Sequence, residues 1–253
     1  MQPDPVQGSG EVRPVLIWDL PVRVFHWTFA SSLTGALAVS LLGSDDSPAF
    51  SWHAVLGLTA AALAALRVVW GWIGTKYARF AAMSYRPAQI AGYFAGVVTG
   101  QDTRHVGHNP GGVVAMVLML LLVFGLAATG VLLGLGHDAA KELHEGLAWG
   151  ILAVVVMHLV GLAVHTVRFR ENIAATMVHG SQRATPESAI ESSRAGVGVA
   201  FLAAAAACLM LLASGRDPSA RTLRVPGLAR ALQIGEAEHR ERGRAESHER
   251  DDD

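Results

Sequence analysis

The sequence has few of the residues that stabilise secreted or charged soluble proteins. It contains one cysteine, Cys208, and only 16% of its 253 residues are charged. A single cysteine excludes a disulfide framework and a cluster of thiolate metal ligands. The net charge is −1, and the sequence has no basic patch interleaved with aromatic residues, so nothing in it indicates nucleic-acid binding.

Apolar residues, by contrast, make up 51% of the chain and occur in long runs. Five runs are long and apolar enough to cross a bilayer: residues 24–42, 53–73, 111–134, 144–166 and 196–213. No strand-like alternation is sustained. The sequence therefore predicts an all-α integral membrane protein. We expect a four-helix transmembrane bundle within residues 23–180, a linker over 181–195 and a fifth transmembrane helix over 196–213.

The segments between the runs also carry structural signals. Asn109 followed by Pro110 is typical of an N-cap and the first position of a helix. Residues 85–100 have apolar side chains at helical spacing, which predicts a short interfacial helix, with an ordered loop as the alternative. Residues 214–253 are rich in Arg, Glu, Asp and Gly. We expect them to form a polar, disordered tail, with a short helix over 228–234.

Basic residues are distributed unevenly among these segments. They precede the first run and lie between the second and third runs and between the fourth and fifth, whereas the opposite side holds only Lys141 up to the fourth run. The positive-inside rule therefore places residues 1–22 in the cytoplasm. No apolar signal-peptide core precedes His26. The side of the tail is left open, because a fifth crossing would place its arginines outside.

Four histidines lie in or at the ends of the runs. His144 and His158 are fourteen residues apart, almost four helical turns, so both imidazoles lie on one side of a helix, roughly 21 Å apart along its axis. With the N-terminus inside, His26 lies at the depth of His158, and His53 at the depth of His144. Ionisable side chains at membrane depth indicate a functional site. Imidazoles on facing helices can hold haem iron, so we predict two axial pairs, His26–His158 and His53–His144.

Two further polar side chains lie towards the cytoplasmic side. Arg67 is inside the second run, where a charge is costly unless paired; a haem propionate is a suitable anion, and snorkelling to the interface is the alternative. His165 could replace His158 as a ligand. Alternatively, it could contact a ligand without binding the iron, or lie beside a quinone. We expect capping or surface roles for His105 and His108.

Several motifs also occur in a recognisable order. They are Ile17-Trp-Asp-Leu-Pro-Val-Arg-Val-Phe-His-Trp27, Leu66-Arg-Val-Val-Trp-Gly-Trp-Ile-Gly-Thr-Lys-Tyr-Ala-Arg-Phe80, Gly107-His-Asn-Pro-Gly111, the His144/His158 pair, and His165 through Glu171-Asn172. Over about residues 15–180 the chain resembles the bacterial cytochrome b561 family, which includes the b-type cytochrome subunits of nickel–iron hydrogenases. The resemblance implies four core helices, two b haems with bis-histidine ligation and electron transfer in the bacterial inner membrane. By position it assigns His26, His53, His144 and His158 as ligands, and its fourteen-residue spacing favours His158 over His165.

Together these features predict a membrane di-haem b-type cytochrome of a respiratory chain. It would pass electrons between the quinone pool and a periplasmic c-type cytochrome or redox enzyme subunit; a homodimer is left open. The sequence shows no nucleophile, paired catalytic carboxylates or phosphate loop, so no catalytic residue is predicted, and any oxidoreductase activity would belong to a quinone site or a complex. The alternatives are a histidine-lined metal-ion binding or transport protein, against which the scarcity of intramembrane carboxylates counts, and a non-redox membrane anchor.

Overall fold

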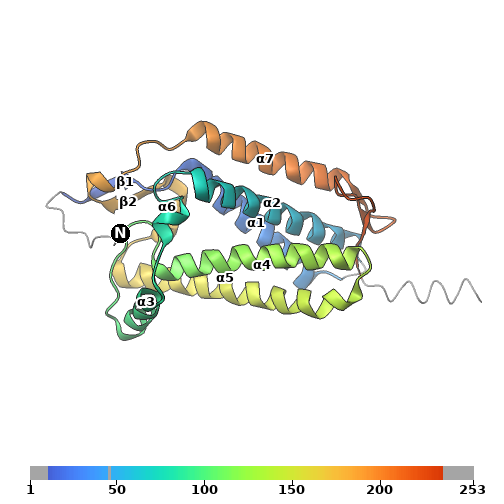
Figure 1. Cartoon of the computed structure of the whole chain (residues 1–253), viewed down its shortest axis with the longest axis horizontal. Helices are drawn as coiled ribbons and strands as arrows, with labels where there is room; N and C mark the ends of the chain where they lie inside the picture. The colour runs from blue at the N-terminus through green and yellow to red at the C-terminus, as the bar shows by residue number, and fades with distance from the viewer. Residues whose placement is uncertain (1–10, 45–46, 236–253) are drawn as a thin grey trace, which may run out of the picture.

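Five long helices form most of the molecule (Figure 1). The computed structural model describes residues 11–44 and 47–235. The long helices are α1 (Leu20–Leu42), α2 (Ser51–Ile73), α4 (Pro110–Gly134), α5 (Lys141–Phe169) and α7 (Ala195–Ser214). Each is long and apolar enough to cross a membrane when counted with the short 3₁₀ turns that precede α2 and α5. The predicted mainly helical membrane fold with five spans is confirmed.

Two of the long helices, α1 and α4, begin where a capping side chain satisfies a backbone N–H group of the first turn. The Asp19 carboxylate accepts a hydrogen bond from the Val22 N–H at 2.8 Å at the start of α1. The Asn109 side chain accepts from the Gly112 N–H at 2.6 Å at the start of α4, with Pro110 as the first residue of that helix. The predicted Asn-Pro helix start is therefore confirmed.

The long helices pack as two hairpins with one added helix. α1 packs against α2, α4 packs against α5, and α2 also contacts α4. α7 packs against α1 and α2, and Figure 1 shows it on the far side of these two helices from α4 and α5. Phe29, Leu63, Leu120, Ile151 and Ala205, each from a different long helix, belong to one buried core.

One end of the bundle, the α3 end, carries short elements that connect the helices. They are α3 (Pro87–Thr99), α6 (Ile173–His179), and the antiparallel strands β1 (Arg13–Leu16) and β2 (Ser181–Ala184), in which Arg13 pairs with Ala184. α3 lies within the segment proposed as an interfacial helix; its place at the membrane surface stays a prediction. The strands were not predicted, because four residues are too few to establish an alternation.

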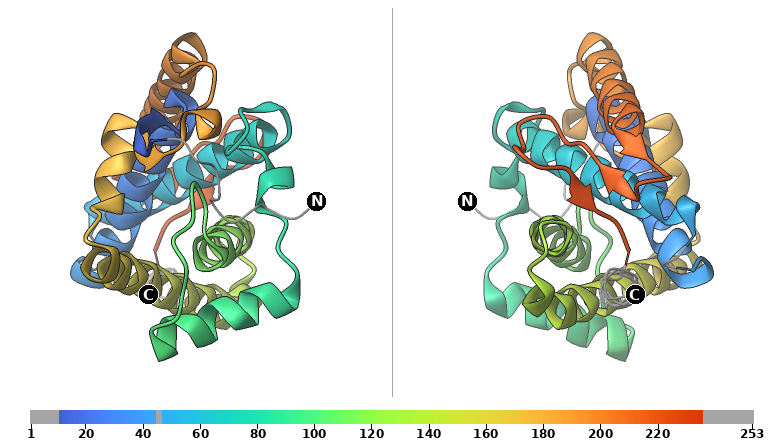
Figure 2. Two further views of the ribbon diagram at one scale, coloured as in Figure 1. Left: turned by 90° about the vertical axis from the view of Figure 1, so that its left-hand side faces the viewer. Right: turned by 90° about the vertical axis from the view of Figure 1, so that its right-hand side faces the viewer.

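The opposite end, the β3–β5 end, is closed by three short antiparallel strands after α7. They are β3 (Arg216–Asp217), β4 (Thr222–Leu223) and β5 (Leu232–Gln233), in the order β3-β4-β5. Figure 2, right, shows these strands facing the viewer across the helix ends. The tail expected to be disordered is thus ordered up to residue 235, and the helix expected over 228–234 is wrong. Two isolated leucines, Leu223 and Leu232, are buried there, a contact that composition does not reveal. Residues 236–253 of the predicted tail lie outside the described residues.

Candidate functional site

His53 and His144 meet between α2 and α5 near the β3–β5 end. Their ring centroids are 6.1 Å apart, and the ring planes are inclined at 72°. Nδ1 of His53 lies 2.9 Å from the backbone oxygen of Ala36 on α1. Because a carbonyl only accepts hydrogen bonds, Nδ1 carries the proton, and Nε2 keeps its lone pair.

His144 is oriented in the same manner by a hydroxyl group. Its Nδ1 lies 2.8 Å from Oγ1 of Thr129, which is also 2.8 Å from the Gly125 oxygen within α4. When the hydroxyl donates its single proton to that carbonyl, it accepts from the Nδ1–H of a neutral His144. Nε2 of His144 is then unprotonated. Both histidines therefore present a nitrogen able to ligate a metal.

A cavity of about 460 Å³ lies beside these two imidazoles. Its wall is mainly apolar and includes Leu33, Leu37, Gly57, Leu126, Ala148 and Leu232. A Cβ added to Gly57 would meet no atom of the described chain within 4 Å, so this helix leaves open space where it borders the cavity. The volume is in the range of cofactor pockets.

His26 on α1 and His158 on α5 form the second predicted pair. Both side chains are half-buried, and the two imidazoles are close enough for their charges to interact. The ring of His26 also contacts Trp27 edge to face, with centroids 5.2 Å apart. The structure thus brings His53 and His144 into ring contact, whereas for His26 and His158 it shows an electrostatic interaction alone. Ligation by any of the four stays a prediction.

Arg67 is buried inside α2, with 2% of its surface exposed. Nη2 contacts the Met116 sulfur at 3.5 Å, and the guanidinium lies 5.5 Å from the centre of the Phe80 ring. Nη1 has no hydrogen-bond partner within the described part of the chain. The charge of the buried Asp19 carboxylate acts on Arg67, but within the described residues no carboxylate is hydrogen-bonded to the guanidinium, and such a buried charge is costly. Its position differs from that of a side chain that snorkels to the interface.

His165 is also buried, near the α3 end of α5. Its ring packs against Phe169 with centroids 4.7 Å apart, and the charges of Glu171 and Arg104 act on it. Nε2 has no hydrogen-bond partner in residues 11–44 and 47–235. His165 is thus placed beside a polar cluster; whether it could act as a ligand stays untested.

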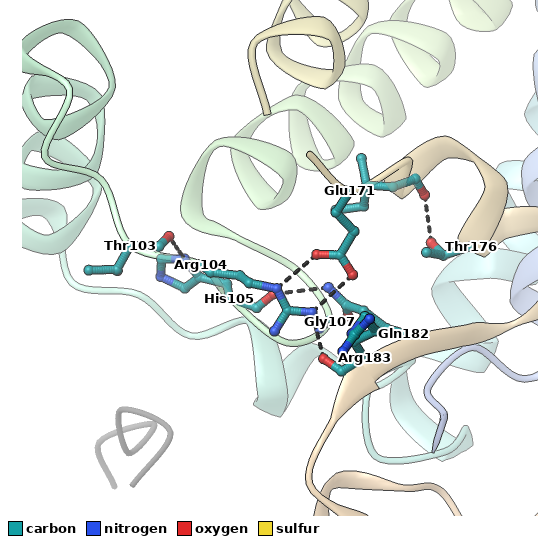
Figure 3. A network of polar contacts seen from close by, with 9 residues as sticks. Thr103, Arg104, His105, Gly107, Glu171, Thr176, Gln182 and Arg183 are labelled. Atoms are coloured by element: carbon teal, nitrogen blue, oxygen red, sulfur yellow. Dashed lines mark hydrogen bonds and ion pairs between the residues drawn. The ribbon is translucent and has the colours of Figure 1, made fainter. Parts of the chain in front are cut away.

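That cluster joins three connecting segments of the α3 end (Figure 3). Arg104 donates from Nε and Nη2 to the two carboxylate oxygens of Glu171, at 2.8 and 2.9 Å. Gln182 accepts from the Gly107 N–H at 2.9 Å and donates to the His105 backbone oxygen at 3.1 Å. The hydrogen bonds from Arg104 hold the pKa of Glu171 below its ordinary value. The sequence did not predict these pairs, because their members are more than sixty residues apart.

His108, for which a capping or surface role was expected, packs inside this end. Its ring contacts Trp18 edge to face, with centroids 4.7 Å apart. Burial, and then the charge of Arg67, lower the pKa of His108 to about 3. The imidazole is therefore neutral at physiological pH.

A bundle of membrane-length helices with paired imidazoles around an apolar cavity defines a class: multi-pass membrane cytochromes that hold haem between helices. The prokaryotic cytochrome b561 family matches residues 17–180, and the chain belongs to that family. It is therefore a membrane b-type cytochrome, and the family implies haem b and electron transfer. The predicted family membership is confirmed.

The chain is also similar to a curated relative. A protein of Rhizobium leguminosarum bv. viciae named probable Ni/Fe-hydrogenase B-type cytochrome subunit is 27% identical over 219 residues, covering 68% of this chain and 90% of the relative. No solved structure matches. Within residues 11–44 and 47–235, no three His, Cys, Asp or Glu side chains gather as ligands for a metal ion.

Proposed function

We propose that the chain is a di-haem cytochrome that transfers electrons between a redox partner on the periplasmic side and the membrane quinone pool. The observation that carries this proposal is the His53–His144 pair with its two unprotonated Nε2 atoms. His53 and His144 would hold one haem iron through these nitrogens. Their ring centroids, 6.1 Å apart, are close enough for both imidazoles to bind a single metal ion.

The second haem would be held by His26 and His158. Both pairs use α5, where the two ligands are roughly 21 Å apart along the helix axis. The orphaned Nη1 of Arg67 suits a propionate of this second haem, because a carboxylate would supply the partner that the buried guanidinium lacks. Bound haem supplies the one-electron chemistry.

The chain's own residues orient the ligands and exclude water. The Ala36 carbonyl and the Thr129 hydroxyl select the tautomers of His53 and His144 and prevent the rings from turning. The cavity wall is mainly apolar, which lowers the dielectric constant beside the imidazoles, and its three charged residues, Asp138, Lys141 and Glu145, are exposed. These contacts tune the potential of a haem held there.

Quinone is assigned to the α3 end. The unpartnered Nε2 of His165 is a buried donor or acceptor that a quinone carbonyl or hydroxyl could satisfy. Basic residues gather in the segments at this end, which places it in the cytoplasm by the positive-inside rule, together with the N-terminus. The β3–β5 end would then face the periplasm.

The partner is proposed from the relative. Because a similar chain is named a probable hydrogenase cytochrome subunit, a redox enzyme subunit is the first partner to test, with a c-type cytochrome as the second.

Visible spectroscopy of the purified protein tests the proposal. A reduced-minus-oxidised b-type spectrum with about two haems per chain is expected. His53→Ala and His144→Ala should each lose the same haem and keep the other, whereas His26→Ala and His158→Ala should lose the other one. A colourless protein that does not take up haem would overturn the proposal and favour a metal-ion protein or a plain anchor.

A further inference from the structure

The segment that follows α7, residues 215–235, forms a cap on the helix ends. It lies beyond the family match, which ends at residue 180. The cap contains β3, β4 and β5 and crosses the end of the bundle (Figures 1 and 2). Its last residues line the same cavity as His53 and His144. It is therefore an addition to the four-helix core at one of the two histidine pairs.

Two leucine side chains of the cap pack between the helices. Leu223 is 0% exposed and Leu232 is 2% exposed, and both belong to a buried cluster with Val55 of α2 and Leu212 of α7. A Cβ added to Gly134, the last residue of α4, would lie 2.8 Å from the Leu232 Cβ. The cap thus approaches the α4 backbone at a position where only glycine leaves room. Burial of the two leucine side chains favours the closed position of the cap.

Polar contacts attach the cap to the start of α2. Nη1 of Arg216 donates to Oγ of Ser51 at 3.0 Å, and its guanidinium lies 4.0 Å from the centre of the Trp52 ring. Within the cap, the Arg224 N–H donates to the Gly215 oxygen at 2.8 Å. Ser51 and Trp52 directly precede His53. The cap is therefore attached next to a predicted ligand.

The cap also forms part of the wall of the histidine cavity. Leu232, Gln233, Ile234 and Gly235 line the same cavity as His53 and His144. The rest of the lining comes from α1, α2, α4, α5 and the turns that precede α2 and α5. One wall of the site is thus supplied by a segment outside the matched family core.

We propose that the cap closes the His53–His144 haem site to water, with Leu232 as its inner wall, and thereby raises the midpoint potential of that haem and limits access of polar oxidants. The inference rests on the proposed function, in which His53 and His144 hold a haem. Oxidised haem iron carries one more positive charge than reduced iron, and a dry apolar wall disfavours the more charged form. Opening the wall should lower the potential of this haem and leave the other unchanged.

The test compares two substitutions in the full-length, haem-loaded protein. Leu232→Asp places a charge in the cavity wall, and Leu228→Asp is the matched control, since Leu228 lies in the same cap but is 38% exposed and does not line the cavity. Spectroscopic redox titration should show that Leu232→Asp raises the oxidised-to-reduced ratio of the His53–His144 haem at least tenfold at fixed potential, about 59 mV for one electron. Ferricyanide should also oxidise that haem faster. The control should match the unaltered protein in both measurements.

The outcomes separate the cap from the proposed function. If His53→Ala and His144→Ala do not remove a common haem, the proposed function fails. If they do, and Leu232→Asp leaves the potential and the ferricyanide rate unchanged, the cap inference alone is overturned. Should Leu232→Asp fail to retain haem, Leu232→Ala decides by the same two measurements, because it opens the wall without adding a charge.

Discussion

At the scale of single residues, the groups that accept hydrogen bonds from the histidine Nδ1 atoms should affect haem binding as the histidines themselves do. A ligand whose Nδ1–H donates a hydrogen bond is a stronger electron donor through Nε2 and is held in one orientation. His53 donates to a backbone carbonyl, which substitution cannot remove, whereas His144 donates to the side chain of Thr129. The Thr129 contact can therefore be tested directly.

Thr129→Val removes the acceptor while keeping the shape of the side chain. We expect the His53–His144 haem to bind about 10–100-fold more weakly, as when outer partners of other metal ligands are lost. Its midpoint potential should rise, because a less basic His144 stabilises the oxidised iron less. Redox titration and haem retention during dilution measure both effects. Thr59→Val is the control, since the buried Thr59 hydroxyl donates to the Val55 oxygen of its own helix and interacts with the Cys208 thiol of α7; equal effects of the two variants would contradict the assignment.

Arg67 offers a second residue-scale prediction. Arg67→Met should reduce haem content at His26–His158 while leaving His53–His144 loaded, because the propionate would lose its partner. The same change should not lower the thermal stability of the haem-free protein, since it removes a buried, incompletely paired charge. Arg67→Lys should retain part of the haem, as it keeps the charge but not the planar fork. Reduced stability of the haem-free Arg67→Met protein would instead assign Arg67 a structural role.

At the scale of elements, an ion pair joins the segment before α4 to the segment after α5. Arg104 and Glu171 are partly exposed, and Arg104 is bonded to both carboxylate oxygens of Glu171. A pair of this exposure contributes at most about 1 kcal/mol. Its contribution depends on the ionisation of Glu171.

The pH dependence of that contribution has a defined sign. The pKa of Glu171 is lowered in the folded protein, so the stabilisation is present above the ordinary glutamate value of 4.5 and is lost as pH falls through the lower folded value. Arg104→Gln should therefore unfold at a lower temperature than the unaltered protein at neutral pH, and the difference should vanish in acid. Thermal melts followed by circular dichroism measure this. Arg79→Gln, at an exposed position of the same end, should show no such difference; a difference that persists in acid would contradict the assignment.

At the scale of the whole molecule, the structure describes five helices long and apolar enough to cross a membrane, and we expect the segments before α1 and after α7 to lie on opposite sides. Many of their large apolar side chains are exposed in the isolated chain, among them Leu121, Trp149 and Val160, as lipid-facing residues should be. α7 alone decides the side of the cap.

Reporter fusions on either side of α7 test this arrangement. Alkaline phosphatase, which is active only outside the cytoplasm, should be inactive when fused after Ser188 and active when fused after Gly235. A fluorescent protein that matures only in the cytoplasm should show the reverse. The Ser188 fusion controls for expression, because it contains all four core helices. Cytoplasmic signals at both positions would show that α7 does not cross the membrane.

Much of the architecture was predictable from local pattern. Helix spans follow from the length of apolar runs, since the bilayer sets the length of a spanning helix. The start of α4 follows from Asn109 and Pro110, because capping involves residues three apart. The spacing of His144 and His158 follows from helix geometry alone. The predicted depth of His26 and His53 depends only on the direction in which each helix runs. The motifs that resemble the family lie within residues 17–180, which the family model matches.

Only the tertiary structure decided which groups meet across the chain. Several contacts join residues from different elements. They are the hydrogen bonds at the histidine Nδ1 atoms, the Arg104–Glu171 ion pair, the pairing of β1 with β2 and the packing of Leu232. Which residues meet in these contacts depends on how the helices rotate and pack, and the local sequence pattern predicts neither. The sequence by itself determined how many helices are long and apolar enough to cross the membrane and which of them carry the four histidines. The tertiary structure determined the ring nitrogen each histidine of the His53–His144 pair offers and the cap that covers them.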